Sequence, residues 1–297
     1  MQTKVAVVTG ANKGIGFGIV RGLCKKFDGD VYLTSRDEGR GREAVKMLEI
    51  EGLSPKFHPL DVTCPQSRAT FISFLQATYG GVDVVVNNAG IIMKNCCSDH
   101  APEADSCTYE EAVVTCRTNF FGTMDFTNEI TPLLRRNARV VNISSSCGFL
   151  KKINGQAPHS LELQKRFADP NLTEAELCDL VNNFIESTKT NTHYANGWSH
   201  SAYDVTKVAI TSLTRIHQKK FDTERPDDDI LVNAVHPGYV DTDMTKHRGR
   251  LTIDEGADAA VWLAVLPPGD PSSPRGGYMW YDRTIVDWVN GPTPSTI

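Results

Sequence analysis

The sequence predicts an α/β fold: a single Rossmann-type, doubly wound parallel sheet of about seven strands with helices on both faces. Short apolar segments alternate with longer segments of helical periodicity through most of the 297 residues, which is typical of β-α-β units. Several of these apolar segments lack polar alternation, as expected for strands covered on both faces. One hydrophobic core can support a chain of this length, so we expect residues 1–297 to form a single domain.

Seven segments that carry apolar runs between turn residues are expected to form strands: Val5–Thr9, Asp30–Thr34, Lys56–Leu60, Val82–Asn87, Ala138–Ile143, Leu231–His236 and Gly277–Trp280. In the first predicted helix, small and apolar residues recur at steps of three and four and so share one buried stripe: Gly16, Ile19, Val20, Leu23, Cys24 and Phe27. Similar patterns predict helices at Arg42–Glu51, Pro65–Tyr79, Tyr109–Leu134, Ser201–Phe221 and Ile253–Leu266.

One segment interrupts this alternation. Residues 147–200 are too many for an ordinary connection between a strand and a helix. Within them, Thr173 followed by Glu176 has the pattern of a capping box, which predicts a helix through about Phe184. We therefore expect a helical insertion just before the helix that carries Tyr203.

Composition and charge exclude several classes of protein. Lys and Arg number 31 against 36 Asp and Glu, a formal charge of −5, so no nucleic-acid partner is expected. The longest apolar run, Ala259–Leu266, is far shorter than the roughly 20 residues that span a membrane, so no membrane partner is expected either. The N-terminus runs directly into the first strand without a leader pattern, so we expect a cytoplasmic protein.

The cysteines do not indicate a metal site. Cys96, Cys97, Cys107 and Cys116 lie near one another in the chain but lack the paired spacing of a zinc site. The simpler interpretation is ordinary thiols in a loop and a helix. A redox role for Cys96, Cys97 or Cys107 stays open.

The first strand leads into a glycine-rich turn. Residues 9–16 read Thr-Gly-Ala-Asn-Lys-Gly-Ile-Gly and precede the first amphipathic helix. Gly10 permits a tight turn, Gly14 lets the backbone approach a pyrophosphate, and Gly16 lets helix and strand pack closely. Because the helix N-terminus adds free N–H donors and a positive dipole, the segment predicts a dinucleotide site that includes Asn12, Lys13 and Ile15; a purely structural turn is the alternative.

The end of the second strand indicates which nicotinamide cofactor binds. An acidic residue there would receive the ribose hydroxyls of NAD, whereas this chain has Ser35 and Arg36. Together with Lys13, Arg36 would stabilise a 2′-phosphate, which favours NADPH/NADP+. The alternative is that Lys13 and Arg36 are two solvated surface cations. The neighbouring Asp37 makes the preference for NADPH over NADH less clear, because it is acidic.

Two more strand ends carry candidate cofactor contacts. After the fourth strand, Asn87, Ala89 and Gly90 permit close backbone approach. After the third, the carboxylate of Asp61 could accept from the adenine amine while Val62 packs beside the ring. A plain helix cap is the alternative for Asp61.

The most specific set of candidate catalytic residues is Ser145, Tyr203 and Lys207. Tyr203 and Lys207 are four residues apart and so share one face of a helix. A nearby ammonium favours the phenolate and brings a tyrosine, which normally titrates near pH 10, into range for acid–base work. The pair alone would carry little weight, but with the glycine turn it predicts an active site.

With these motifs the chain resembles the short-chain dehydrogenase/reductase superfamily, and more closely the monomeric NADPH-dependent carbonyl reductases of animals. The matching segments are Thr9–Gly16, Asn87–Gly90, Thr118–Thr123, Asn142–Ser145, Gly197–Trp198, Ser201–Lys207 and Pro237–Gly238 with Thr242. The resemblance implies that Tyr203 is the general acid and that Lys207 lowers its pKa and binds the nicotinamide ribose. Ser145, the second serine of its pair, would hold the substrate oxygen.

The resemblance also implies roles for residues farther from the acid. Asn119 would fix a water in a proton relay, and Pro237, Gly238, Val240 and Thr242 would flank the nicotinamide. A hydrogen bond at a helix kink is the alternative for Asn119, and a helix cap is the alternative for Thr242. A glutathione-contacting surface in the loop from Ile91 to Thr108 is not implied, because that loop looks longer here.

The expected function is therefore the NADPH-dependent reduction of ketones, aldehydes or quinones by one dinucleotide-binding catalytic domain. Two alternatives stay open: a dedicated steroid, prostaglandin or alkaloid dehydrogenase/reductase, and a non-catalytic NADPH-sensing partner protein. The insertion helix must bury its apolar residues, which are Leu172, Leu177, Leu180, Val181, Phe184 and Ile185. We expect it to cover the face where a second subunit would dock, which predicts a monomer.

Overall fold

The computed structural model describes residues 2–93, 106–292 and 294. Within them, one sheet runs in the strand order β3-β2-β1-β4-β5-β6-β7-β8. Neighbouring strands pair in parallel from β3 to β7, and β8 pairs with β7 in the antiparallel sense. The predicted doubly wound parallel sheet is confirmed, with the correction that an eighth, antiparallel strand closes one edge.

Seven strands lie at or near their predicted positions, although β5 begins four residues early: β1 Val5–Val8, β2 Asp30–Ser35, β3 Lys56–Pro59, β4 Val82–Asn87, β5 Leu134–Ile143, β6 Leu231–Val235 and β7 Tyr278–Met279. The eighth, β8 Ile285–Val286, was not predicted. β1 and β6 are buried along their whole length, which explains their unbroken apolar sequences. Because β1 to β6 are parallel, their carboxyl ends meet at one edge of the sheet.

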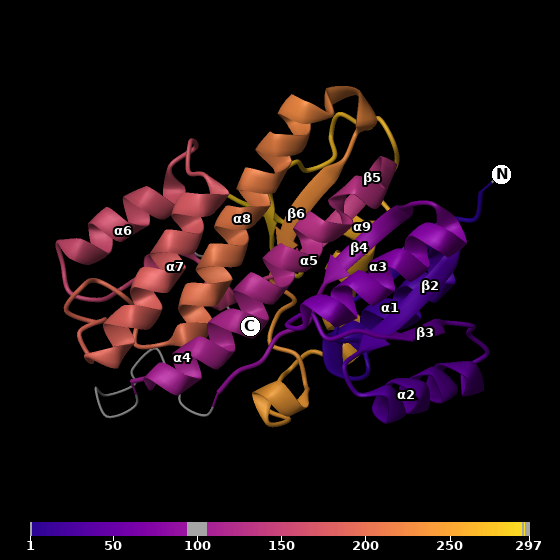
Figure 1. Cartoon of the computed structure of the whole chain (residues 1–297), viewed down its shortest axis with the longest axis horizontal. Coiled ribbons are helices and arrows are strands. Elements are labelled where there is room, and N and C mark those ends of the chain that lie inside the picture. The colour runs from indigo at the N-terminus through magenta and orange to yellow at the C-terminus, as the bar shows by residue number, and fades with distance from the viewer. Residues whose placement is uncertain (1, 94–105, 293, 295–297) are drawn as a thin grey trace.

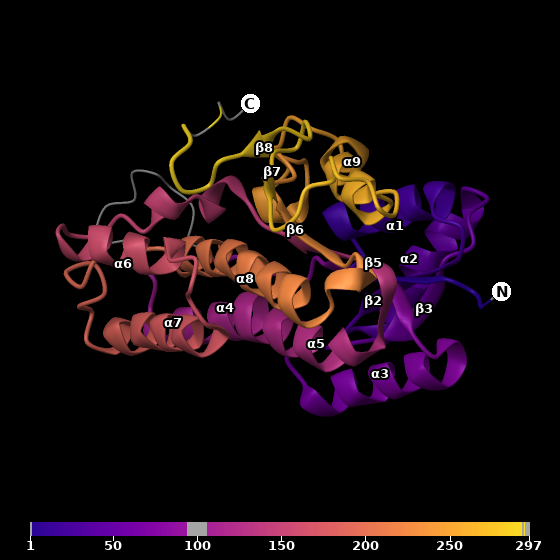
Figure 2. The ribbon, with the colours of Figure 1, turned by 90° about the horizontal axis from the view of Figure 1, so that it is seen from above.

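Helices cover both faces of the sheet (Figures 1 and 2). One face carries α1 Gly14–Lys26, α2 Glu38–Ile50 and α9 Ile253–Ala264. The other carries α3 Pro65–Tyr79, α5 Gly122–Ile130 and α8 Ala202–Glu224. No helix among the described residues is both long enough and apolar enough to cross a membrane.

The helix predicted at Tyr109–Leu134 is in fact several elements. α4 spans Tyr109–Cys116, a π-helical turn spans Arg117–Phe121, α5 follows, and a 3-10 turn at Thr131–Leu133 leads into β5. α2 also begins earlier than the predicted Arg42, because the Asp37 side chain accepts from the Arg40 backbone N–H and caps the helix there.

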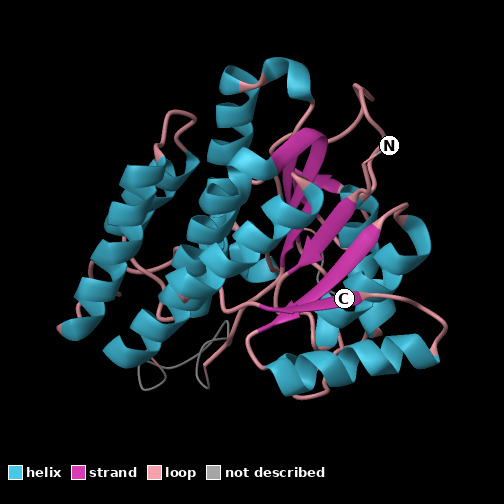
Figure 3. Ribbon diagram, turned by 45° about the vertical axis from the view of Figure 1, so that its right-hand side comes forward, coloured by secondary structure: helices cyan, strands magenta, loops and turns pink. Residues whose placement is uncertain are grey.

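The insertion contains two α-helices, α6 His159–Ala168 and α7 Glu174–Lys189, of which only α7 was predicted. Thr173 and Glu176 form the expected capping box. Figure 3 shows both helices standing beside the sheet rather than over it. α7 packs against α4 and α8, and it buries Leu177, Leu180, Val181 and Phe184 almost completely.

Candidate active site

The glycine turn lies at the carboxyl edge of the sheet, between β1 and α1. Gly10 and Gly14 both have left-handed backbones, with φ of 62° and 59°, which favour glycine. A Cβ on Gly10 would lie 2.8 Å from the Ala89 Cα. The turn therefore keeps the open backbone that close approach of a pyrophosphate requires.

Asn88 holds this turn against the end of β4, a role the sequence analysis missed. Its Nδ2 donates to the carbonyl oxygens of Thr9 and Gly10, at 2.8 and 3.0 Å. In return, the Thr9 hydroxyl accepts from the backbone N–H groups of Asn88 and Ala89, both at 3.0 Å. These bonds fix the two segments that were both predicted to contact a cofactor.

The side chain of Asn87 points elsewhere. Its Nδ2 donates to Thr127 on α5 and to Asn142 on β5, at 2.9 and 2.8 Å inside the core. The side chain of Asn87 is therefore used inside the core, and the cofactor contact predicted here is one that its backbone would make.

Asp61 and Val62 build the turn after β3. The Asp61 carboxylate accepts from the backbone N–H and the hydroxyl of Thr63, at 2.9 and 2.7 Å. Val62 is buried beside Gly122, where a Cβ would lie 3.1 Å from the Val62 side chain. One Asp61 oxygen thus organises the turn, while Val62 joins it to α5.

The three adjacent serines after β5 have different surroundings. Ser144 is buried, and its hydroxyl lies 3.0 Å from the Thr211 hydroxyl on α8. Ser145 is half-buried, and its hydroxyl accepts from the Cys147 N–H at 3.2 Å. Ser146 donates its N–H to Nδ1 of His236 at 2.9 Å. Ser145 is therefore better placed than Ser144 to meet a ligand.

Two further residues, which the sequence analysis missed, support this serine turn. The Tyr278 hydroxyl donates to the carbonyl oxygen of Ser145 at 2.5 Å. Burial raises the pKa of Tyr278 well above its usual value, so the group stays a donor. Burial lowers the pKa of His236 to about 3, so its neutral ring accepts from Ser146. A tyrosine in β7 and a histidine after β6 carried no sequence signal for this role.

Tyr203 and Lys207 lie one turn apart on α8, as their spacing predicts. The Lys207 Nζ lies 5.4 Å from the Tyr203 ring centre and donates to the carbonyl oxygen of Ile143 at 2.7 Å. Burial lowers the pKa of Lys207 to about 8. A largely buried tyrosine and a buried cation therefore face the end of β5.

Asn119 lies in the π-helical turn and reaches the same helix. Its Oδ1 accepts from the Ile91 N–H at 2.8 Å, and its Nδ2 donates to the Ile91 carbonyl at 2.9 Å. A longer bond of 3.2 Å reaches the Thr206 hydroxyl on α8. The side chain thus ties the segment after β4 to the tyrosine helix, and π-helical turns are frequent at functional sites.

The turn after β2 contains the cations that would meet a 2′-phosphate. Arg36 is exposed there. Asp37 is the acidic neighbour that made the cofactor preference ambiguous in the sequence. Its carboxylate accepts from the Arg40 backbone N–H at 2.9 Å and pairs with the Arg40 guanidinium at 3.0 Å. The Arg40 N–H is the leading cause that lowers the pKa of this carboxyl. Arg40 is a further cation at this turn that the sequence analysis missed.

The loop after β6 closes the site from the other side. Gly238 has φ of 84°, and Val240 pairs with Leu251. The Thr242 side chain lies 3.4 Å from where a Gly14 Cβ would be. Within the same loop, the Met244 Sδ lies 3.9 Å from the Tyr203 hydroxyl.

Lys13 is the one predicted phosphate contact whose surroundings differ from expectation. Its Nζ pairs with Asp243 at 2.6 Å, so the cation has a carboxylate partner within this chain.

Of the cysteines considered for a metal, Cys96 and Cys97 lie outside the described residues. Cys107 and Cys116 are buried in the core beside α4. In the part of the chain that the structure describes, no three His, Cys, Asp or Glu side chains come together as metal ligands would.

Comparison with known proteins decides the family. A family model described as short chain dehydrogenase matches residues 4–159, the span that holds the glycine turn, Asn119 and Ser145. The chain belongs to the short-chain dehydrogenase family. Tyr203 and Lys207 follow the matched span and are reached from it through the insertion.

Curated relatives match almost the whole chain. Carbonyl reductase 1 of Rattus norvegicus, which is named for NADPH, is 48% identical over 284 residues, or 96% of this chain and 98% of that protein. The protein of the same name from Homo sapiens is 45% identical with the same coverage.

Solved structures share the fold over almost the whole chain. Salutaridine reductase from Papaver somniferum superimposes with a TM-score of 0.79 at 33% identity, covering 94% of this chain and 99% of that one. Menthone neomenthol reductase from Mentha piperita gives a TM-score of 0.77 at 30% identity, covering 95% and 99%.

Proposed function

We propose that this protein is an NADPH-dependent carbonyl reductase that converts ketones, aldehydes or quinones to alcohols. The observation that carries the proposal is the placement of Lys207 beside both the Tyr203 ring and the end of β5, two residues before Ser145. The glycine turn opens at the same edge of the sheet. A proton donor, a polarising hydroxyl and a dinucleotide cradle thus converge.

In this mechanism the bound nicotinamide supplies the hydride. Tyr203 donates a proton to the carbonyl oxygen, which Ser145 holds by a hydrogen bond from its hydroxyl. Lys207 stabilises the tyrosinate that remains, because an adjacent ammonium favours the charged form. Orientation and electrostatic stabilisation of the developing alkoxide provide the rate enhancement.

Asn119 positions the proposed catalytic residues and does not itself contact the substrate. It fixes the segment after Gly90 and the Tyr203 helix relative to one another through its bonds to Ile91 and Thr206. We assign it the positioning of the proton relay that reprotonates Tyr203 through Lys207.

The preference for NADPH follows from charge at the β2–α2 turn. Arg36 is exposed there, and the Asp37 carboxylate pairs with the Arg40 guanidinium and caps α2. The nearby carboxylates of Asp37 and Glu38 thus pair with Arg40 and Arg42 of α2, while the exposed Arg36 guanidinium is available to a 2′-phosphate.

The alternatives are a reductase dedicated to one substrate and a sensor without turnover. Similarity to salutaridine reductase at 33% identity is compatible with a dedicated enzyme, but the curated relatives at 45% and 48% identity are named carbonyl reductases. A sensor would need only the glycine turn, whereas this chain also carries Ser145, Tyr203 and Lys207.

NADPH consumption by the purified protein should be measured against a panel of quinones, ketones and aldehydes. We expect turnover of several of them with NADPH. Turnover of a single compound would support the dedicated enzyme, and NADPH binding without any turnover would refute the proposal in favour of a sensor.

We also propose that residues 1–297 form one catalytic domain that acts as a cytoplasmic monomer. The support for a monomer is α7, whose apolar side chains cover the α4–α8 face. An obligate dimer interface buries more than about 2,000 Å², and α7 already occupies the face on which we would expect such an interface. Light scattering at micromolar concentration should give the mass of one chain; a stable dimer or tetramer would refute the proposal.

A further inference from the structure

The ion pair between Lys13 and Asp243 joins two segments that are distant in the sequence. Lys13 is the N-cap residue of α1. Asp243 begins the 3-10 turn Asp243–Thr245, in the loop after β6. The Lys13 Nζ lies 2.6 Å from the Asp243 Oδ2, and this pair is the largest cause that lowers the pKa of the Asp243 carboxyl.

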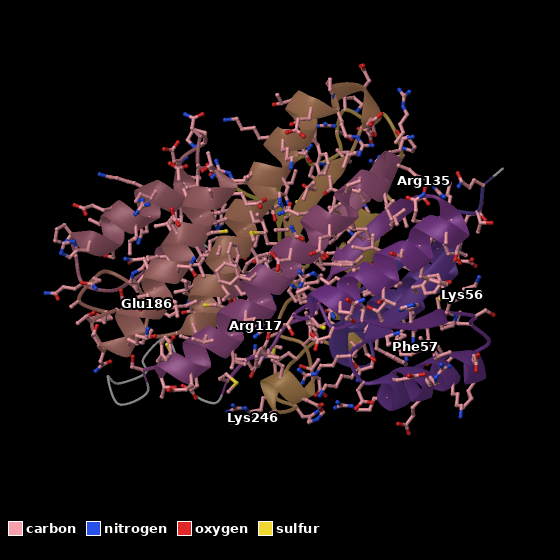
Figure 4. The ribbon with its side chains drawn as sticks, in the orientation of Figure 1. Lys56, Phe57, Arg117, Arg135, Glu186 and Lys246 are labelled. Carbon is pink, nitrogen blue, oxygen red and sulfur yellow. The ribbon has the colours of Figure 1, made fainter. Side chains whose placement is uncertain are left out.

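The segment around Asp243 is a compact unit. The Asp241 N–H donates to the Leu251 carbonyl at 2.8 Å, and the Thr245 hydroxyl donates to the Val240 carbonyl at 2.7 Å. The His247 ring lies 2.8 Å from Asp241 and 3.2 Å from Asp243. Figure 4 shows the labelled Lys246 at the outer edge of this turn. Asp243 therefore has a second partner, His247, when Lys13 is engaged elsewhere.

The same turn reaches both ends of the proposed site. The Thr242 side chain faces Gly14 of the glycine turn. One residue beyond Asp243, the Met244 Sδ lies 3.9 Å from the Tyr203 hydroxyl. The Lys13–Asp243 pair thus lies beside the predicted phosphate site and close to the proposed proton donor.

We propose that Asp243 is a specificity-determining residue for the cofactor, because its carboxylate competes with the 2′-phosphate of NADPH for Lys13. The phosphate carries more negative charge than one carboxylate, so it can take Lys13 from Asp243. NADH has no such group and leaves the pair intact. Asp243 therefore weakens NADPH binding selectively and moderates the preference that Arg36 and Lys13 create. This inference rests on the proposed function, since it takes Lys13 as a phosphate contact.

The expected effect is modest. The two side chains are 62% and 58% exposed, and exposed ion pairs shift an equilibrium by no more than about fivefold. Salt should reduce the effect further, because solvent-exposed charges are screened.

The test is Asp243→Asn, with dissociation constants for NADPH and NADH measured by fluorescence titration without a carbonyl substrate. We expect NADPH to bind about two- to fivefold more tightly at low salt, with NADH unchanged. Asp254→Asn is the matched control, because Asp254 is an equally exposed aspartate paired with Arg21 at 2.8 Å. It should leave the ratio of the two constants unchanged.

A second background separates competition from a structural role. In Lys13→Met, NADPH should bind more weakly than in the wild type, and adding Asp243→Asn should no longer tighten it, as in a double-mutant cycle. Equal loss of both cofactors in Asp243→Asn would overturn the inference, since the pair would then close over any bound dinucleotide. Unchanged NADPH binding in Asp243→Asn would overturn it as well. Because binding is read without turnover, failure of the proposed reductase activity would be seen separately.

Discussion

The Lys207 ammonium donates to the carbonyl oxygen of Ile143 while it lies 5.4 Å from the centre of the Tyr203 ring. One buried cation thereby joins the end of β5, which carries the serine turn, to the helix that carries the proposed proton donor. Its charge costs free energy because it is buried, and that cost lowers the Lys207 pKa to about 8. The geometry and the charge of the proposed site therefore depend on the same side chain.

Tyr203→Phe should abolish turnover and leave NADPH binding nearly unchanged. The change removes the hydroxyl and keeps the ring that packs beneath Lys207, and positioned general acids contribute about 10²–10⁴-fold in rate. Steady-state NADPH oxidation and a separate cofactor titration give the two readouts. Residual activity within tenfold of wild type would remove Tyr203 from the acid role.

Lys207→Ala should lower both turnover and cofactor affinity, since we assign Lys207 both roles. Its pKa of about 8 adds a pH dependence: kcat/KM, which reports the free enzyme, should fall as pH rises through about 8 and Lys207 loses its charge. If Lys207→Arg keeps activity, the fall in its kcat/KM should move to higher pH, because a guanidinium stays charged. A fall at the same pH in Lys207→Arg would mean that another group causes it.

The same shift has a consequence for stability. Between pH about 8 and the unfolded-state value of about 10.4, the unfolded chain holds a proton on Lys207 that the folded chain lacks. Unfolding free energy from this group therefore rises with pH in that window. Urea unfolding of the cofactor-free protein should show the rise, and Lys207→Met should lack it.

Arg36→Asp should move cofactor preference from NADPH toward NADH. It removes a cation from the 2′-phosphate and offers a carboxylate to free ribose hydroxyls. We expect a loss of about 1.5–3 kcal/mol in NADPH binding, the range for a hydrogen bond to a charged group. Lys46→Asp, an equal change of charge on an exposed position of α2, is the control. An unchanged ratio of NADPH to NADH affinity in Arg36→Asp would mean that Arg36 does not contact the phosphate.

Glu174→Gln should loosen the docking of α7. Glu174 lies 3.0 Å from the buried His217 on α8 and accepts from Asn128 on α5 at 2.6 Å. We expect a loss of about 1–3 kcal/mol of unfolding free energy, the cost of weakening such buried partners. The His217 bond is the largest cause that lowers the Glu174 pKa, so this stability is present above the unfolded value of about 4.3 and is lost as pH falls through the folded pKa.

Denaturant unfolding of Glu174→Gln at pH 7 and near pH 4 tests this, and the difference from wild type should shrink at the lower pH. Glu186→Gln on the same helix is the control, because its ion pair with Lys189 is exposed and should change stability by less than about 0.5 kcal/mol. Equal losses in the two variants would contradict a specific anchor at Glu174.

Features with a local cause could be predicted from the sequence. The glycine turn needs left-handed backbone at Gly10 and Gly14, and α7 begins at a capping box, so each carries its own signal. α6 has no such signal: its N-cap side chain makes no bond, and its buried stripe is only Ser160, Leu163 and Phe167.

Features that depend on distant partners could not be predicted. The direction of the Asn87 side chain is set by Thr127 and Asn142, and the pairing of Lys13 is set by Asp243. β8 has two residues and exists through its ladder with β7. In each case the residue type permits several environments, and only the packed fold selects one.

The insertion also separates the two halves of the chemistry along the chain. Ser145 and Tyr203 meet only when the loop of residues between them closes, and closing a loop of that length costs about 2 kcal/mol more than closing one of about five residues. The burial of Leu177, Leu180, Val181 and Phe184 against α4 and α8 offsets this cost. The glycine turn and the ends of β2 and β4, by contrast, lie within the first ninety or so residues and need no such closure. During synthesis or refolding, a chain whose insertion has not yet docked would form its glycine turn before Ser145 and Tyr203 came together.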